Sequence, residues 1–175
     1  MEELQILKEC IDDALDECQR IILENPNIVL SEGDLEKLLC CCIHNKIHKK
    51  TEYSVHCQIS NYPCTNRSLN ARFDIVLLKE AYLQPNASLR KGQTYDTNEH
   101  ESFVIELKYV RKGDSMSKVY DDLVDIKKCG ENTWLYVVVL FDSDTNQSKK
   151  NKLITQASEY EEYDKRLFCH TLIKS

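Results

Sequence analysis

The chain has 175 residues (20.4 kDa), 42% hydrophobic and 30% charged, with only 4 Gly and 3 Pro. This composition excludes disordered, collagen-like and low-complexity classes. No apolar run approaches the roughly 20 residues of a membrane-spanning helix, and the acidic, amphipathic first residues are unlike a secretory signal, so we expect a soluble cytoplasmic protein without a membrane partner. The net charge of −6 (23 Lys+Arg, 29 Asp+Glu) argues against binding nucleic acid by electrostatics alone, because each phosphate contact uses a Lys or Arg.

The first half of the chain predicts two helices followed by two strands. Apolar residues three and four apart over 3–23 form one helical stripe: Leu4, Leu7, Ile11, Leu15, Cys18 and Ile22. Ser31 is a typical N-cap for a second helix that runs to about His44, with a core stripe of Leu35, Leu38, Leu39, Cys42 and Ile43. From about residue 52 the apolar period becomes two, which predicts a strand, and ARFDIVLL at 71–78 predicts another.

The second half of the chain predicts strands that alternate with helices. Strands are expected at 102–110, 134–141 and 166–173, helices at about 115–129 and 152–164, and loops at 61–70, 84–98 and 142–151. The resulting order, ααβββαβαβ, predicts an α/β fold in which helices flank a central mixed β-sheet. We find no repeat and no linker, so one domain over residues 1–175 is expected.

Nine cysteines are unusual for this length, and Cys40, Cys41 and Cys42 are consecutive in the second predicted helix. Adjacent helical positions point in different directions, the number is odd, and no CxxC pair occurs, so a disulfide scaffold or a structural zinc site fits poorly. Buried, reduced thiols are the main interpretation. A metal cluster of Cys40, Cys41 and Cys42 with His44 is the alternative.

Two charges interrupt the apolar strand predicted at 102–110. Glu106 and Lys108 lie two apart and therefore share one face, and Asp74 opens the apolar run of the strand at 71–78. Charges among apolar residues are costly unless they are paired or bind a metal. Two carboxylates can hold a hard cation such as Mg²⁺, which polarises a phosphate and activates water, while a lysine orients that water or offsets developing charge.

RFD at 72–74 followed by IELK at 105–108, within an α-β-β-β-α-β order, resembles the PD-(D/E)XK superfamily of restriction-endonuclease-like nucleases. The resemblance covers about 31–141, with the helix 3–23 and the helix and strand 152–173 as additions. It implies that Asp74, Glu106 and the backbone carbonyl of Leu107 bind Mg²⁺, or Mn²⁺ in its place, and that Lys108 is the catalytic lysine. Phe73 stands where the family often has Pro, and the long step from Asp74 to Glu106 implies an inserted loop or hairpin.

Many members of this superfamily also place a glutamate on the helix before the sheet. At about 100° per residue, Glu32 lies nearer than Glu36 to the centre of the apolar stripe, so Glu32 is the expected catalytic and metal-binding residue and Glu36 the reserve. On the helix after the triplet, Lys118 and Asp122 are weaker candidates. The simplest alternative for Glu32 is a charge that favours the helix dipole, and for Glu106 and Lys108 an ion pair on a solvated sheet face.

The resemblance implies a metal-dependent endo- or exonuclease that acts on DNA rather than RNA, with RNA open, as a homodimer or with a partner subunit. Two local basic clusters would then contact the phosphate backbone: Lys46, Lys49 and Lys50, and Lys149 and Lys150. A non-catalytic nuclease-fold protein that serves as an interaction or assembly module is the alternative, which the acidic charge favours. A cysteine-rich metal or redox protein is a third possibility.

Overall fold

The computed structural model describes residues 2–62, 71–82, 100–117, 119, 129, 132–142, 147–163 and 166–174. It is an α/β protein whose described part has three α-helices: α1 (Glu2–Glu24), α2 (Glu32–Ile47) and α4 (Gln147–Tyr163). One sheet contains the strands β1 (Tyr53–Tyr62), β2 (Ala71–Lys79), β3 (Ser102–Val110), β4 (Thr133–Phe141) and β5 (Leu167–Ile173). Two short 3₁₀ helices complete it: η1 (Pro26–Ile28) and η2 (Glu80–Tyr82).

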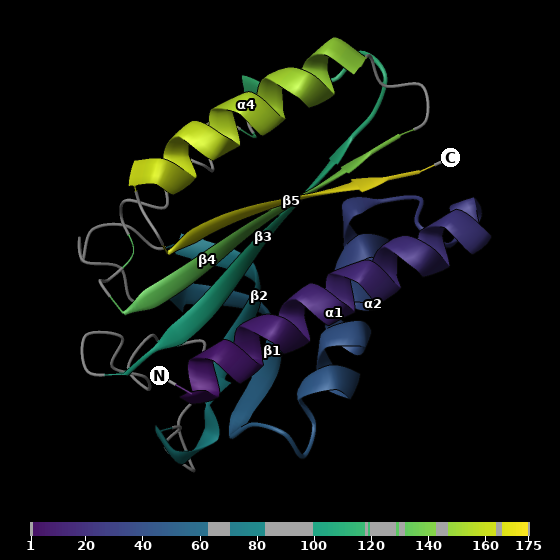
Figure 1. Ribbon diagram of the computed structural model, residues 1–175. Helices are drawn as coiled ribbons and strands as arrows, with labels where there is room; N and C mark the ends of the chain where they lie inside the picture. The colour runs from purple at the N-terminus through teal and green to yellow at the C-terminus, as the bar shows by residue number, and fades with distance from the viewer. Residues whose placement is uncertain are drawn as a thin grey trace.

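The five strands lie in the sheet in the order of the sequence, β1-β2-β3-β4-β5. The first three pair antiparallel, whereas β3, β4 and β5 pair parallel, so the predicted mixed sheet is confirmed. Figure 1 shows α1 and α2 together on one face of the twisted sheet and α4 on the opposite face. None of the described helices is both long and apolar enough to cross a membrane.

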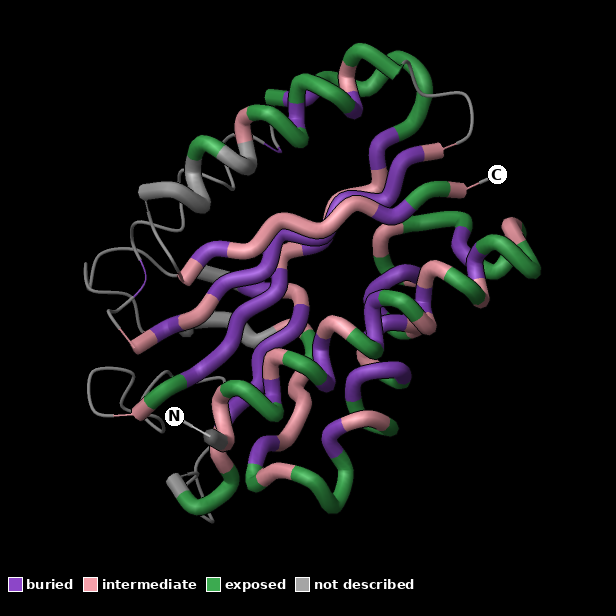
Figure 2. Tube along the Cα trace, in the orientation of Figure 1, coloured by how far each residue is buried: buried purple, intermediate pink, exposed green. Residues whose placement is uncertain are grey.

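Strand alternation sends apolar side chains into two separate cores. The core under α1 and α2 takes Ile75, Leu77, Phe103, Ile105 and Leu107 from β2 and β3. The opposite core takes the intervening residues Val76, Leu78 and Val104, together with Leu153 of α4. Figure 2 shows the central strands β3 and β4 largely buried between the helices, whereas β5 is only partly buried. Because both faces are covered, β4 is apolar almost throughout, as a strand buried on two sides requires.

Most element boundaries agree with the sequence pattern to within a few residues. Ser31 is the N-cap of α2, and its hydroxyl accepts a hydrogen bond from the Asp34 N–H at 3.2 Å. The start of α4 was predicted wrongly, because α4 begins at Gln147 and not at 152. Its first turns are polar, with a Gln147–Asn151 side-chain hydrogen bond of 3.1 Å, so no apolar period marks them before Leu153.

The described order of elements differs from the predicted order between β3 and β4. The helix expected at about 115–129 falls mostly on residues outside those described. The loop expected at 61–70 is described only at its first two residues, which belong to β1, and the loop expected at 84–98 lies outside the description.

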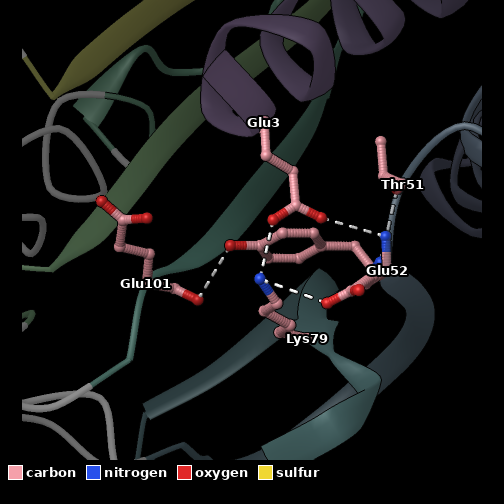
Figure 3. A network of polar contacts seen from close by, with 6 residues as sticks. Glu3, Thr51, Glu52, Lys79 and Glu101 are labelled. Carbon is pink, nitrogen blue, oxygen red and sulfur yellow. Dashed lines mark hydrogen bonds and ion pairs between the residues drawn. The ribbon is translucent and has the colours of Figure 1, made fainter. Parts of the chain in front are cut away.

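A polar network ties the start of α1 to β1 and β2 (Figure 3). The Lys79 ammonium donates to Glu3 at 2.7 Å and lies 3.3 Å from a carboxylate oxygen of Glu52, while the Glu52 N–H donates to Glu3 at 3.1 Å. The hydrogen bond from Lys79 lowers the pKa of Glu3, and the same bond raises the pKa of Lys79 to about 12. Charge pairing therefore adds to the apolar packing that holds the N-terminal helix on the sheet.

Candidate active site

The candidate site lies where β2 and β3 stop pairing. Their antiparallel register runs from Leu78–Ser102 to Ile75–Ile105, and Asp74 and Glu106 are the next residues on the two strands. An oxygen of the Asp74 carboxylate, Oδ2, accepts a hydrogen bond of 2.8 Å from the Leu107 backbone N–H. The two strands diverge beyond the Ile75–Ile105 pair, at a position that we call the fork. There a side chain of β2, and not its backbone, accepts the hydrogen bond from the edge of β3.

Lys108 lies between two carboxylates that come from different elements. Its Nζ is 3.9 Å from Oε2 of Glu106 and 4.0 Å from Oε1 of Glu32, at the first turn of α2. Glu32 also accepts a hydrogen bond of 3.3 Å from the Tyr109 N–H through Oε2. The side chains of Glu106 and Lys108 are 16% and 20% exposed and that of Glu32 is 44% exposed, so one side of this group is open to solvent.

Two alternate backbone N–H groups of β3 therefore donate hydrogen bonds to carboxylates. Leu107 donates to Asp74 and Tyr109 donates to Glu32, two residues further along the strand. Since N–H groups two apart on a strand point to the same side, both carboxylates lie along the edge of β3 from which β2 has departed. Asp74 and Glu32 are both carboxylates that the resemblance implies, and both lie along this edge of β3.

The turn before α2 is fastened to the ends of β3 and β5, which positions Glu32. The Arg111 guanidinium donates to the carbonyl of Leu30, and its centre lies 5.0 Å from the Tyr109 ring. The Lys174 ammonium donates to the carbonyl of Val29 at 3.0 Å and to the Tyr109 hydroxyl at 3.2 Å. These two cations hold the start of α2 over the carboxyl end of β3.

Glu36 is the more buried of the two helix carboxylates, with only 9% of the residue exposed. It lies one turn after Glu32 on α2 and accepts a hydrogen bond from the side-chain amide of Gln58 on β1. The structure thus gives the two glutamates different partners: Glu32 lies beside Lys108, and Glu36 faces β1.

Gln58 is a site residue that the sequence pattern did not reveal. Its φ of 55° is left-handed, which is uncommon for a residue other than glycine within a strand. Its neighbours Cys57 and Ile59 pair with Ile75 and Phe73, the residues on either side of Asp74 in β2. The preceding residue, Cys57, contacts Cys40 of α2, so two successive side chains reach the same helix and the usual alternation is broken. A period-two sequence pattern contains no signal for such a local irregularity.

The cluster Lys46, Lys49 and Lys50 lies at the far end of α2 from Glu32, about 20 Å along the helix axis. Lys46 forms a 2.7 Å ion pair with Glu17 of α1, and the hydrogen bond to Glu17 raises the pKa of Lys46. Lys49 and Lys50 are exposed. Phosphate contacts there would be remote from the fork.

The second predicted basic pair is already engaged within the protein. Lys149 donates to the backbone carbonyl of Asp114 at 2.8 Å. Lys150 is only 8% exposed, with Nζ lying 5.7 Å from the centre of the Phe141 ring, so it would have to leave this contact to reach a phosphate. Lys118 and Asp122 lie outside the described residues.

A metal cluster on the consecutive cysteines does not fit their directions. Cys40 contacts Cys57, Cys41 is exposed, and Cys42 is buried. Within the described residues, no three His, Cys, Asp or Glu side chains are arranged so that together they could hold a metal ion. At the fork, two carboxylates and a backbone carbonyl are the donors at hand, a set that suits Mg²⁺, since Mg²⁺ uses one or two carboxylates and keeps several waters.

No family model, no curated protein and no solved structure matches the chain.

Proposed function

We propose that this chain is a metal-dependent nuclease with a restriction-endonuclease-like core. The observation that carries the proposal is the gathering of Asp74, Glu106, Lys108 and Glu32, from β2, β3 and α2, at the fork between two strands. Charged groups in a largely apolar sheet are costly, and here they share one partly open site, which is typical of a functional constellation.

Asp74 and Glu106 would hold one Mg²⁺ between β2 and β3. The N–H and C=O of one strand residue point to the same side, so the Leu107 carbonyl is directed, like its N–H, toward Asp74 and can serve as a further oxygen ligand. Such a cation, when bound, polarises the scissile phosphate and lowers the pKa of a bound water.

Lys108 would position the attacking water and offset charge on the phosphate. Its ammonium lies almost equally far from Glu106 and Glu32, at 3.9 and 4.0 Å, so the two carboxylates share it. A lysine flanked by two carboxylates stays charged, which suits electrostatic stabilisation better than proton abstraction. Glu32, whose side chain is 44% exposed, would accept hydrogen bonds from water at the open side.

The substrate class that fits this site is a nucleic acid, and we propose DNA. Lys112 follows Lys108 by four residues, just beyond the end of β3, and is exposed, whereas the neighbouring Arg111 guanidinium is engaged with the Leu30 carbonyl and the Tyr109 ring. Lys112 is therefore better placed for a phosphate contact beside the fork than the lysines at the far end of α2. Cutting both strands of a duplex would require a second copy or a partner subunit.

Cleavage of supercoiled plasmid, single-stranded DNA and RNA with Mg²⁺ or Mn²⁺ tests the proposal. We expect cleavage by the wild type that is abolished by EDTA and reduced at least 100-fold in Lys108→Ala and Asp74→Asn. Lys37→Ala, which removes an exposed lysine elsewhere on α2, is the matched control and should retain activity. Equal residual cleavage in all four proteins would identify a contaminating nuclease and contradict the proposal.

A non-catalytic interaction module is the second candidate, favoured by the net charge of −6. A protein without catalytic activity could keep these residues for structural reasons, because the Asp74 and Glu32 carboxylates also accept hydrogen bonds from backbone N–H groups of β3. The absence of both cation binding and cleavage in a protein that unfolds cooperatively would favour this candidate.

A further inference from the structure

Two cysteines from different elements nearly touch at the edge of the candidate site. Sγ of Cys57 on β1 lies 2.9 Å from Sγ of Cys40 on α2, only about 0.9 Å longer than a disulfide bond. The two residues are 17 positions apart in sequence. Because α2 packs directly on β1, closing the bond requires only a small displacement of the two side chains.

Proximity is combined here with access from solvent. Cys57 is exposed and Cys40 is partly exposed. In contrast, Cys18 and Cys42 interact with each other but are 0% and 3% exposed, so a soluble oxidant cannot reach them. Cys41 is exposed, but it is the neighbouring Cys40 and Cys42 that contact cysteines of β1 and α1.

We propose that Cys40 and Cys57 are a redox modification site that reacts with a low-molecular-weight disulfide, such as glutathione disulfide, and closes to an intramolecular disulfide. The Cys57 thiolate attacks one sulfur of the oxidant, forms a mixed disulfide and expels the first thiolate. The Cys40 thiolate then attacks Sγ of Cys57 and expels the second thiolate. The two protons lost by the cysteines end on the two released thiols, so the protein is oxidised by two electrons and the small disulfide is reduced.

The surroundings of the pair determine how fast it reacts. Partial desolvation by the surrounding side chains raises the pKa of Cys57, although this thiol reaches solvent, and desolvation raises the pKa of Cys40 to about 12. The charged and titratable groups around them are Glu36 and Cys41 on α2 and Asp74 on β2, which favour the protonated thiols further. Oxidation is therefore slow at neutral pH and accelerates as the pH rises, since the thiolate is the reacting form.

The new bond would fasten α2 to β1 beside the Glu36–Gln58 contact. Cys40 lies one helical turn after Glu36, and Cys57 directly precedes Gln58. A cross-link that closes a loop of this length should raise the midpoint of thermal unfolding by about 5–10 °C. This part of the inference requires no nuclease activity.

Peptide mapping of the oxidised 175-residue chain tests the proposal. The protein is incubated with glutathione disulfide at pH 7 and pH 8.5, remaining thiols are alkylated, and peptides are analysed by mass spectrometry. We expect a Cys40–Cys57 cross-linked peptide, two hydrogen masses lighter than its reduced parts, which forms several-fold faster at pH 8.5 and disappears on reduction.

Cys41→Ser is the matched control and should form the same cross-link. Cys40→Ser should instead accumulate glutathione on Cys57. Should either variant fail to fold, the wild-type peptide map alone still decides the outcome. Cross-linking of Cys57 to Cys41, or a Cys57 that keeps glutathione in the wild type without transfer to Cys40, would overturn the proposal.

Discussion

The Asp74 carboxylate, one residue beyond the last pair of β2 and β3, accepts a 2.8 Å hydrogen bond from the N–H of Leu107, which lies two residues beyond that pair. A strand that ends its pairing leaves backbone donors that need partners. Here a carboxylate supplies the partner and so holds the fork open at the position where a cation would bind. One side chain therefore has both a structural and a proposed catalytic role, and the two can be separated by substitution.

Asp74→Asn should leave stability nearly unchanged, because the amide oxygen can still accept the Leu107 N–H. Asp74→Ala should lower the free energy of unfolding by about 1–2 kcal/mol, since it leaves that N–H without its partner. Denaturant unfolding followed by the fluorescence of Trp134, which stacks on Phe103, measures both. If Asp74→Asn destabilised the protein as much as Asp74→Ala, the hydrogen bond would not be what holds the fork.

Gln58 and Glu36 should be energetically coupled. Gln58→Ala removes the amide that donates to a nearly buried carboxylate and should cost about 1–3 kcal/mol. In the Glu36→Gln background the same substitution should cost about 1 kcal/mol less, because the buried group is then uncharged. A double-mutant cycle by urea unfolding gives the coupling energy. Costs that simply add would show that the contact contributes nothing.

The Glu3–Lys79–Glu52 network should make the attachment of α1 depend on pH. The hydrogen bonds to the two glutamates raise the pKa of Lys79 from its ordinary value of 10.5 to about 12, so its contribution is complete below pH 10.5 and is lost as the pH rises through about 12. Glu3 has its pKa lowered by the hydrogen bond from Lys79, so its contribution is complete above about 4.5 and is lost as the pH falls below that value.

Lys79→Met, which removes the ammonium, should therefore lower stability by up to about 1 kcal/mol at pH 7, with the difference from wild type shrinking below pH 4. Thermal unfolding midpoints of the two proteins between pH 3 and pH 7 measure this difference. A gap that stays constant over that range would show that the lost contribution is packing of the lysine stem rather than charge pairing.

Nucleic-acid affinity should depend on the cations near the fork. Lys112→Gln should weaken DNA binding several-fold and reduce the salt dependence of log K by about one contact, because Lys112 is an exposed cation four residues after Lys108. The matched variant Lys49→Gln changes an exposed lysine at the far end of α2 and should bind like the wild type. Fluorescence anisotropy at two salt concentrations compares them, and the opposite ranking would move the interface to the far end of α2.

Periodicity predicted the elements that bury one clear face. The apolar stripe of α1, the alternation of β3 and the apolar run of β4 place the helix and strands to within a few residues. Periodicity failed at the start of α4, where it predicted a solvated loop that includes Lys149 and Lys150. In the structure, Lys149 donates to a backbone carbonyl and Lys150 lies over an aromatic ring. Polar helical turns carry no apolar period and are found only through their contacts.

The candidate residues of the site were accessible from sequence because charges in apolar strands stand out. Asp74, Glu106 and Lys108 interrupt runs that are otherwise buried. The distances between these side chains could not be predicted from sequence. The different partners of Glu32 and Glu36 could not be predicted either, because they depend on the left-handed backbone of Gln58 and on the turn that Arg111 holds in place. Both are long-range or local backbone effects without a repeating signature.

The proposed chemistry depends on a divalent cation held between Asp74 and Glu106, and a Mn²⁺ titration followed by the electron paramagnetic resonance signal of free Mn²⁺ tests it most directly. We predict one site in the wild type, weakened at least 30-fold in Asp74→Asn/Glu106→Gln. The control Asp13→Asn/Asp16→Asn removes the same charge from exposed positions of α1 and should bind like the wild type. Equal binding in all three proteins, or no binding in the wild type, would contradict a cation site at the fork.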